Sequence, residues 1–72
     1  MKKKFKMEEL DCANCAAKME AAIRKIAGVH EANISFMAQK LTLEADDDRF
    51  DEILDEAQRC CERVDKGCRI VR

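Results

Sequence analysis

The spacing of apolar residues changes repeatedly along this chain, and this change constrains the fold more than any other feature. Residues 2–10 alternate through Phe5 and Met7, which predicts a strand with one buried face. Apolar residues then recur every three or four positions over residues 16–29, which predicts a helix that ends at Gly28. A strand followed by an amphipathic helix is therefore expected in the first half of the chain.

Alternation returns in the middle of the chain. Residues 30–36 alternate in apolar character, and Leu41 and Leu43 alternate with polar neighbours. Residues 37–40 have the character of a turn, so the two segments are expected to pair as a β-hairpin.

A second helix is predicted after the acidic run at residues 46–48. Aspartates favour the amino end of a helix, where they cap free amides, and no closing glutamate or glycine stands in register for a calcium loop. One face of this helix is apolar, through Phe50, Ile53, Leu54, Ala57, Cys61 and Val64. A turn at residues 65–67 and a last strand at residues 68–71 follow.

The resulting order is strand, helix, strand, strand, helix, strand. This order predicts an α+β, ferredoxin-like βαββαβ fold with a four-stranded antiparallel sheet and two helices on one face. The other face of the sheet is expected to be polar. At 72 residues the chain is expected to form a single domain, residues 1–72.

Composition excludes several classes of function. The net charge of −1 gives no basic excess for nucleic acid, so no nucleic-acid partner is expected. The basic start of the chain is not followed by the apolar run of a signal peptide, and no segment approaches a membrane span. Five cysteines, an odd number, argue against a disulfide scaffold and for reduced thiols, so a cytoplasmic location without membrane contact by this segment is expected.

Two cysteines three residues apart, Cys12 and Cys15, lie in the predicted loop before the first helix. The free amides and dipole of a helix start stabilise thiolates, and two thiolates form a soft ligand set for copper(I), zinc, cadmium, mercury or lead. Two protein ligands leave coordination positions open, whereas structural zinc sites normally close four. The pair is therefore interpreted as an open site for capture and transfer of a metal ion.

Two other interpretations of the pair are disfavoured. A thiol-disulfide redox module of the thioredoxin type is disfavoured by the short chain and by the absence of proline. A structural zinc module needs a second pair at suitable spacing, and Cys60, Cys61 and Cys68 do not form another C-x-x-C.

The element order and the cysteine loop together resemble the heavy-metal-associated domains of metallochaperones and of the N-termini of metal-exporting P-type ATPases. The family signature G-M-x-C-x-x-C corresponds here to residues 9–15, with Glu9 in place of glycine and Leu10 in place of methionine. The resemblance implies that Leu10 packs beneath the metal loop as an apolar residue of similar size. Glu9 adds a charge and leaves the backbone there less free.

Asp11, directly before the first cysteine, bears on the choice of metal. Zinc, cadmium and lead accept oxygen as well as sulfur and take three or more ligands, whereas two thiolates satisfy copper(I). A D-C-x-x-C sequence is similar to that of zinc-, cadmium- and lead-exporting ATPases. We therefore expect Cys12, Cys15 and Asp11 to bind Zn²⁺, Cd²⁺ or Pb²⁺ rather than Cu⁺ or Hg²⁺; the alternative role for Asp11 is to cap the loop amides.

These features imply a metal-binding domain that is not itself an enzyme. The resemblance implies a cytosolic N-terminal domain of a Zn/Cd/Pb-translocating pump, whose membrane-embedded and other cytosolic domains would be its partners. The alternative is a free-standing metallochaperone for Cu(I) or Hg(II).

The remaining candidate residues have simpler expected roles. Cys61 is in phase with the apolar face of the second helix and is expected in the core, whereas Cys60 is expected at the flank of that face. The alternative is that either thiol serves as an additional metal ligand. The others have structural or surface roles: Met19 is expected in the core, Cys68 as a core or edge thiol of the last strand, and His30 and Lys66 on the surface.

Overall fold

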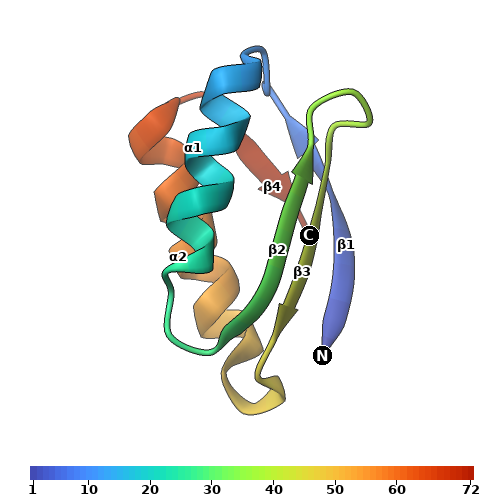
Figure 1. The fold of residues 1–72 in the computed structure, drawn as a ribbon, viewed down its shortest axis with the longest axis vertical. Coiled ribbons are helices and arrows are strands. Elements are labelled where there is room, and N and C mark those ends of the chain that lie inside the picture. Colours follow the sequence, from blue (N-terminus) through green and yellow to red (C-terminus); the bar gives the residue numbers. More distant parts are fainter.

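The computed structural model describes residues 1–72 and has the predicted order of elements. The elements are β1 (Lys2–Glu8), α1 (Ala13–Arg24), β2 (Val29–Ser35), β3 (Lys40–Ala45), a short 3-10 turn (Asp47–Arg49), α2 (Phe50–Val64) and β4 (Arg69–Val71). The strands form one antiparallel sheet in the order β2-β3-β1-β4, and both helices cover the same face of it (Figure 1). The ferredoxin-like fold is therefore confirmed.

The core lies between the sheet and the helices. Inward residues of neighbouring strands meet in register, as where Phe5 pairs with Leu41 and Met7 with Ile70. Eight large core side chains are fully buried and belong to all the layers: Met7, Met19, Ile23, Leu41, Leu43, Ile53, Cys61 and Cys68. Alternation in the strands and the helical period in α1 and α2 thus place one apolar surface against another.

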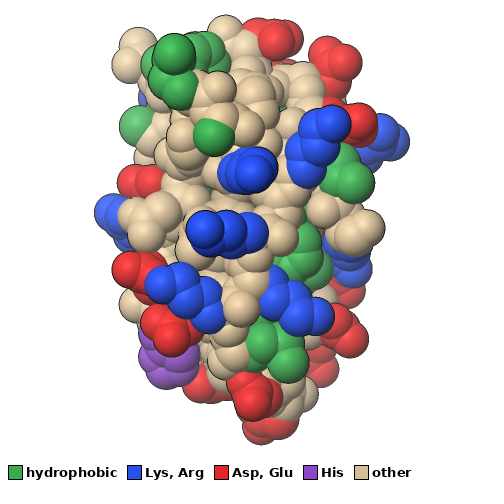
Figure 2. All heavy atoms as spheres, turned by 90° about the vertical axis from the view of Figure 1, so that its right-hand side faces the viewer, with side chains coloured by type: hydrophobic (Ala, Val, Ile, Leu, Met, Phe, Trp, Pro, Cys, Tyr) green, Lys and Arg blue, Asp and Glu red, His purple; other side chains and the backbone are tan.

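The opposite face of the sheet is polar, as predicted. Lys2, Lys4 and Lys6 alternate outward along β1, and Lys6 lies opposite Lys40 of β3. Figure 2 shows lysine and arginine side chains gathered across this face, with acidic side chains around them. Lysines on the open face keep it hydrated, so only one side of the sheet is available for the core.

The prediction that the first helix runs to Gly28 is wrong at both ends. Helix α1 begins at Ala13 and ends at Arg24, and the amides of Lys25 and Ile26 then donate to carbonyls three residues back, at 3.1 Å each. Ile26 still packs against the core from this tightened turn, which explains why the apolar period continues past the helix. Gly28, at φ +94°, instead turns the chain into β2.

The acidic run before α2 also differs from its expected role. Asp47 and Asp48 form the 3-10 turn that leads into the helix, but no side chain caps α2. Asp46 accepts a hydrogen bond from Nε2 of exposed His30 at 2.7 Å instead. The helix starts where predicted. Asp51 and Glu52 in its first turn interact favourably with the positive end of the helix dipole but do not cap its free amides.

Candidate metal centre

Three connections meet at one end of the molecule. These are the β1–α1 loop, the β2–β3 turn and the α2–β4 loop, at the top of Figure 1. The chain thus brings residues near positions 10, 37 and 66 to one end, and the cysteine pair lies on the first of these connections.

Cys12 is the N-cap of α1 and Cys15 lies in its first turn. The backbone N–H of Cys15 donates to Sγ of Cys12 at 3.2 Å, so the sulfur takes the place of the usual capping oxygen. The expectation that both cysteines lie in the loop is therefore wrong for Cys15. Helix-favouring Ala13, Ala16 and Ala17 follow the N-cap and allow the helix to begin three residues early.

The two thiols differ in acidity. Hydrogen bonds from the Cys15 thiol and from the backbone amides, with the charge of Lys18, lower the pKa of Cys12 below its usual range. The pKa of Cys15 is raised, because its thiol hydrogen-bonds to Cys12 and because burial and the negative charge of Asp65 disfavour a second thiolate. The pair therefore holds its first negative charge on Cys12, at the positive end of the helix dipole.

This asymmetry predicts the order of alkylation. The thiolate is the reacting form, so Cys12 should react with iodoacetamide at a lower pH than Cys15. Peptide mapping by mass spectrometry across a pH series measures both residues in one sample. In a Cys15→Ala variant the thiol donor is lost, and the pH profile of Cys12 should move upward. Alkylation of Cys15 before Cys12 would contradict the assignment.

Asp11 is exposed and lies just outside the helix cap. The structure contains no group of three or more His, Cys, Asp or Glu side chains arranged to hold a metal ion, so Asp11 does not already form a cluster with both thiols. Burial raises the pKa of Cys68, and the charges of Asp65 and then Asp11 add to that shift. Asp65 of the α2–β4 loop is the carboxylate whose charge acts on Cys15.

Sequence reasoning missed Asp65, although it opens the D-K-G turn that was expected at the metal end. The Asp65 carboxylate accepts the Gly67 amide at 3.1 Å, which fixes the turn. Lys66, between them, is exposed as predicted. The α2–β4 loop therefore holds a carboxylate whose charge acts on the cysteine pair.

The other three cysteines are buried outside the pair. Cys61 and Cys68 lie in the core as predicted, and Sγ of Cys68 lies 3.8 Å from Sδ of core Met19. Burial raises the pKa of Cys61 to about 12, so this thiol is neutral at physiological pH. Cys60 is 8% exposed and is buried toward α1 rather than at the flank of its face. The structure does not bring these thiols into one metal cluster with Cys12 and Cys15.

A glutamine that the sequence did not single out holds the metal loop. The side-chain amide of Gln39 donates to the carbonyls of Leu10 and Phe36, each at 2.8 Å. The backbone carbonyl of Gln39 accepts a hydrogen bond from the backbone amide of Met7 at 2.8 Å. Gln39 thus ties the β2–β3 turn to the backbone just before Asp11, while buried Leu10 anchors the loop from below.

Glu9 adopts a left-handed backbone, at φ +61°. This conformation costs an L-residue roughly 1–2 kcal/mol and glycine very little, although glycine loses more entropy on folding. We expect Glu9→Gly to raise the free energy of unfolding by about 0.5–1 kcal/mol, measured by urea denaturation. Glu9→Ala removes the charge but keeps the strain, so it should change stability little. Equal gains in both variants would attribute the effect to charge instead.

A ferredoxin-like fold with two thiols at the start of its first helix defines a class of small domains that bind soft metal ions. Residues 4–60 match the heavy-metal-associated domain family, and the chain belongs to this family. The family is one of metal-binding domains. No helix in the structure has both the length and the apolar character needed to cross a membrane.

Similar proteins fall into two groups. The chain is 43% identical over 44 residues to the zinc/cadmium/lead-transporting P-type ATPase of Escherichia coli K12; the match covers 61% of this chain but only 6% of the pump. It is 26% identical over 66 residues to the copper chaperone CopZ of Enterococcus hirae, covering 92% of this chain and 88% of the chaperone. A solved CopZ metallochaperone has the same fold, with a TM-score of 0.73, 22% identity, and coverage of 99% and 100% of the two chains.

Proposed function

We propose that residues 1–72 form one domain that binds Zn²⁺, Cd²⁺ or Pb²⁺ through Cys12, Cys15 and Asp11 and passes the ion on. The observation that carries this proposal is the Cys12–Cys15 pair at the start of α1, with the Cys15 amide 3.2 Å from Sγ of Cys12. This geometry stabilises one thiolate before metal arrives and leaves the second thiol beside it.

Transfer follows from the small number of protein ligands. Two half-buried sulfurs at one end of the molecule leave coordination positions open to an incoming thiolate or carboxylate. The ion can therefore move by ligand exchange, in which a new bond forms before an old one breaks. The chain's own role is to lower the pKa of Cys12, which favours its thiolate, and to fix the backbone of the loop through Leu10 and Gln39.

The preference for a divalent ion is supported by carboxylates around the pair. Asp11 stands next to Cys12 in sequence, and the charge of Asp65 acts on Cys15. Two carboxylates add negative charge and oxygen donors, which favour a 2+ ion over Cu⁺. The 43% identity to a zinc/cadmium/lead-transporting ATPase supports a role as the cytosolic N-terminal domain of such a pump, with the rest of the pump as partner.

Metal titrations of Asp11→Ala and Asp65→Ala test the choice of metal. We expect Asp11→Ala to weaken Zn²⁺ and Cd²⁺ binding by about 10–100-fold, the range found for supporting groups at metal sites, and to leave Cu⁺ binding nearly unchanged. Asp65→Ala is the matched control, since it removes the same charge from the other loop. Unchanged Zn²⁺, Cd²⁺ and Pb²⁺ affinities in Asp11→Ala would exclude Asp11 as a ligand, and loss only in Asp65→Ala would assign the oxygen donor to the α2–β4 loop.

A free-standing metallochaperone for Cu(I) or Hg(II) is the second candidate. It is favoured by the match to CopZ, which spans 92% of this chain and 88% of the chaperone. The reading frame beyond Arg72 separates the two candidates: membrane spans and a phosphorylation domain support the pump, whereas an immediate stop codon supports the chaperone.

A further inference from the structure

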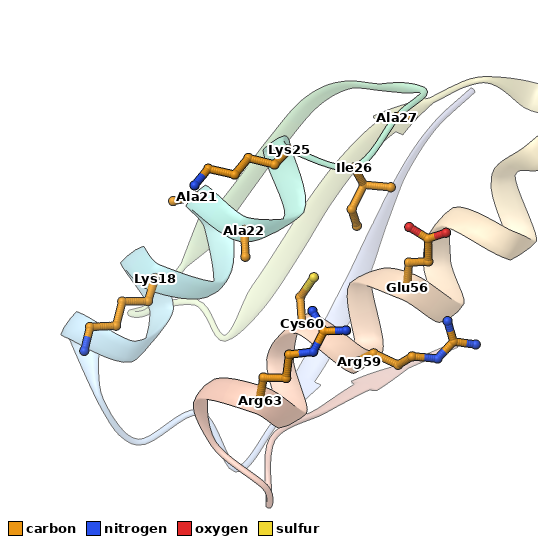
Figure 3. Close-up of a pocket in the computed structure, with 10 residues that line it drawn as sticks. All are labelled: Lys18, Ala21, Ala22, Lys25, Ile26, Ala27, Glu56, Arg59, Cys60 and Arg63. Atoms are coloured by element: carbon orange, nitrogen blue, oxygen red, sulfur yellow. The ribbon is translucent and has the colours of Figure 1, made fainter.

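A groove of about 640 Å³ runs between the two helices, on the side of the molecule away from the sheet (Figure 3). Its floor is apolar: the side chains of Ala22 and Ile26 point toward Cys60 of α2. Cys60 and the half-buried Ile26 both pack against the core, so the floor is continuous with the interior of the domain. The groove begins near Lys18, one turn after Cys15.

The rim of the groove is strongly basic. Lys18 comes from α1 and Lys25 directly follows its last residue, whereas Arg59 and Arg63 come from α2 (Figure 3). Glu56 is the one acidic side chain among the residues that line it. This local excess of positive charge contrasts with the net charge of −1 for the whole chain.

The basic side chains of the rim have no ion-pair partners within the chain. Arg59 and Arg63 of the groove form no ion pair, and neither do Lys18 and Lys25. The other four arginines of the chain are each paired with an acid: Arg24, Arg49, Arg69 and Arg72. The contrast is specific to the arginines, because Lys2 is the one lysine of the chain in an ion pair, and the groove keeps the charge of Arg59 and Arg63.

We propose that this groove docks a short acidic segment of a partner protein, with carboxylates on the basic rim and a small apolar side chain on the floor of Ala22, Ile26 and Cys60. Complementary charge supports this occupant, because four unpaired cations from two helices surround a concave apolar floor. This docking surface is separate from the cysteine pair and does not depend on a bound metal ion.

The surroundings of the groove favour a protein segment over other anions. Asp51 and Glu62 are exposed on α2 and form no ion pair, so this helix also carries negative charge that would oppose a long polyanion such as nucleic acid. A lipid surface would meet the rim but not the recessed floor. A short segment with its own apolar side chain uses both features.

The test uses the metal-free chain and a fluorescein-labelled helical peptide of about 15 residues, the minimum for an isolated helix, with glutamates on one face and two leucines between them. We expect binding that weakens between ~0.05 and ~0.5 M salt, together with shifts of the Ala22 and Ile26 methyl signals in NMR spectra. The same peptide with glutamine in place of glutamate should not bind.

Charge reversal identifies the surface. Arg59→Glu/Arg63→Glu should weaken peptide binding by about tenfold or more, and Lys25→Glu at the C-terminal end of α1 should weaken it independently. The matched control is Lys4→Glu/Lys6→Glu on the open face of the sheet, which makes the same change in charge and should leave binding intact. Circular dichroism confirms that each variant is folded.

Four results would overturn the docking proposal. These are no binding, equal loss in the groove and sheet variants, methyl shifts confined to the open sheet face, or groove-dependent binding to anionic phosphatidylglycerol vesicles without binding to the peptide. Since the protein carries no metal in this experiment, each of these results leaves the proposed metal site unaffected.

Discussion

Replacing either Cys12 or Cys15 with serine is expected to lower the affinity for Zn²⁺ and Cd²⁺ by about 100-fold or more, since even supporting groups at metal sites are worth about 10–100-fold. The hydroxyl of serine stays protonated and is a hard donor, so one of the two soft ligands is lost. Competition with a chromophoric chelator measures the affinity. The structure places no third thiol in the cluster that would compensate.

Cys60→Ala is the matched control for these serine variants. Cys60 is buried at the floor of the interhelical groove, outside the cysteine pair, and alanine is a small apolar replacement. The metal affinity of the Cys60→Ala variant should equal that of the unmodified protein. If Cys60→Ala lost as much affinity as Cys12→Ser, a thiol of α2 would be a ligand and the two-thiolate assignment would be wrong.

Replacing Leu10 with alanine is expected to produce the largest loss of stability near the metal loop. Leu10 is 2% exposed, and its carbonyl accepts the Gln39 side chain at 2.8 Å. Large-to-small changes at buried leucines cost about 2–5 kcal/mol, a large part of the roughly 5–10 kcal/mol that stabilises a small domain. We also expect weaker metal binding in the folded fraction, because the loop loses its apolar anchor.

Leu10→Met separates anchoring from chemistry. Methionine is similar in volume, so the variant should lose less than about 1.5 kcal/mol in urea denaturation and keep its metal affinity. An equal loss of stability in the alanine and methionine variants would show that Leu10 is not held by packing. A gain in metal affinity in Leu10→Met would show that this side chain reaches the ion, contrary to the buried position of Leu10.

The elements of the fold follow directly from periodicity, whereas their ends do not. Met7 on β1 and Met19 and Ile23 on α1 lie in the core as the pattern predicts, and half-buried Phe5 packs against it. The pattern cannot distinguish a last helical turn from a tighter turn whose side chain still packs, and this explains the misplacement at Ile26 and Gly28. A similar limit applies at the start of α1, because a cysteine sulfur is not an expected cap.

The metal centre was predictable only where its residues are adjacent in sequence. Cys12, Cys15 and Asp11 form one short motif. The contributions of Gln39 and Asp65 depend on which turns meet in space: Gln39 reaches a carbonyl 29 positions earlier in the chain. The basic groove likewise combines residues of two helices, and charge balance along the sequence gives no sign of it.

X-ray absorption spectroscopy of the zinc complex tests the central claim most directly, because it counts the sulfur ligands. We expect two sulfur scatterers at about 2.3 Å, with oxygen or nitrogen donors at about 2.0–2.2 Å in the remaining positions. This result would establish an open site built from Cys12 and Cys15. Four sulfurs in one protein chain, or none, would contradict it.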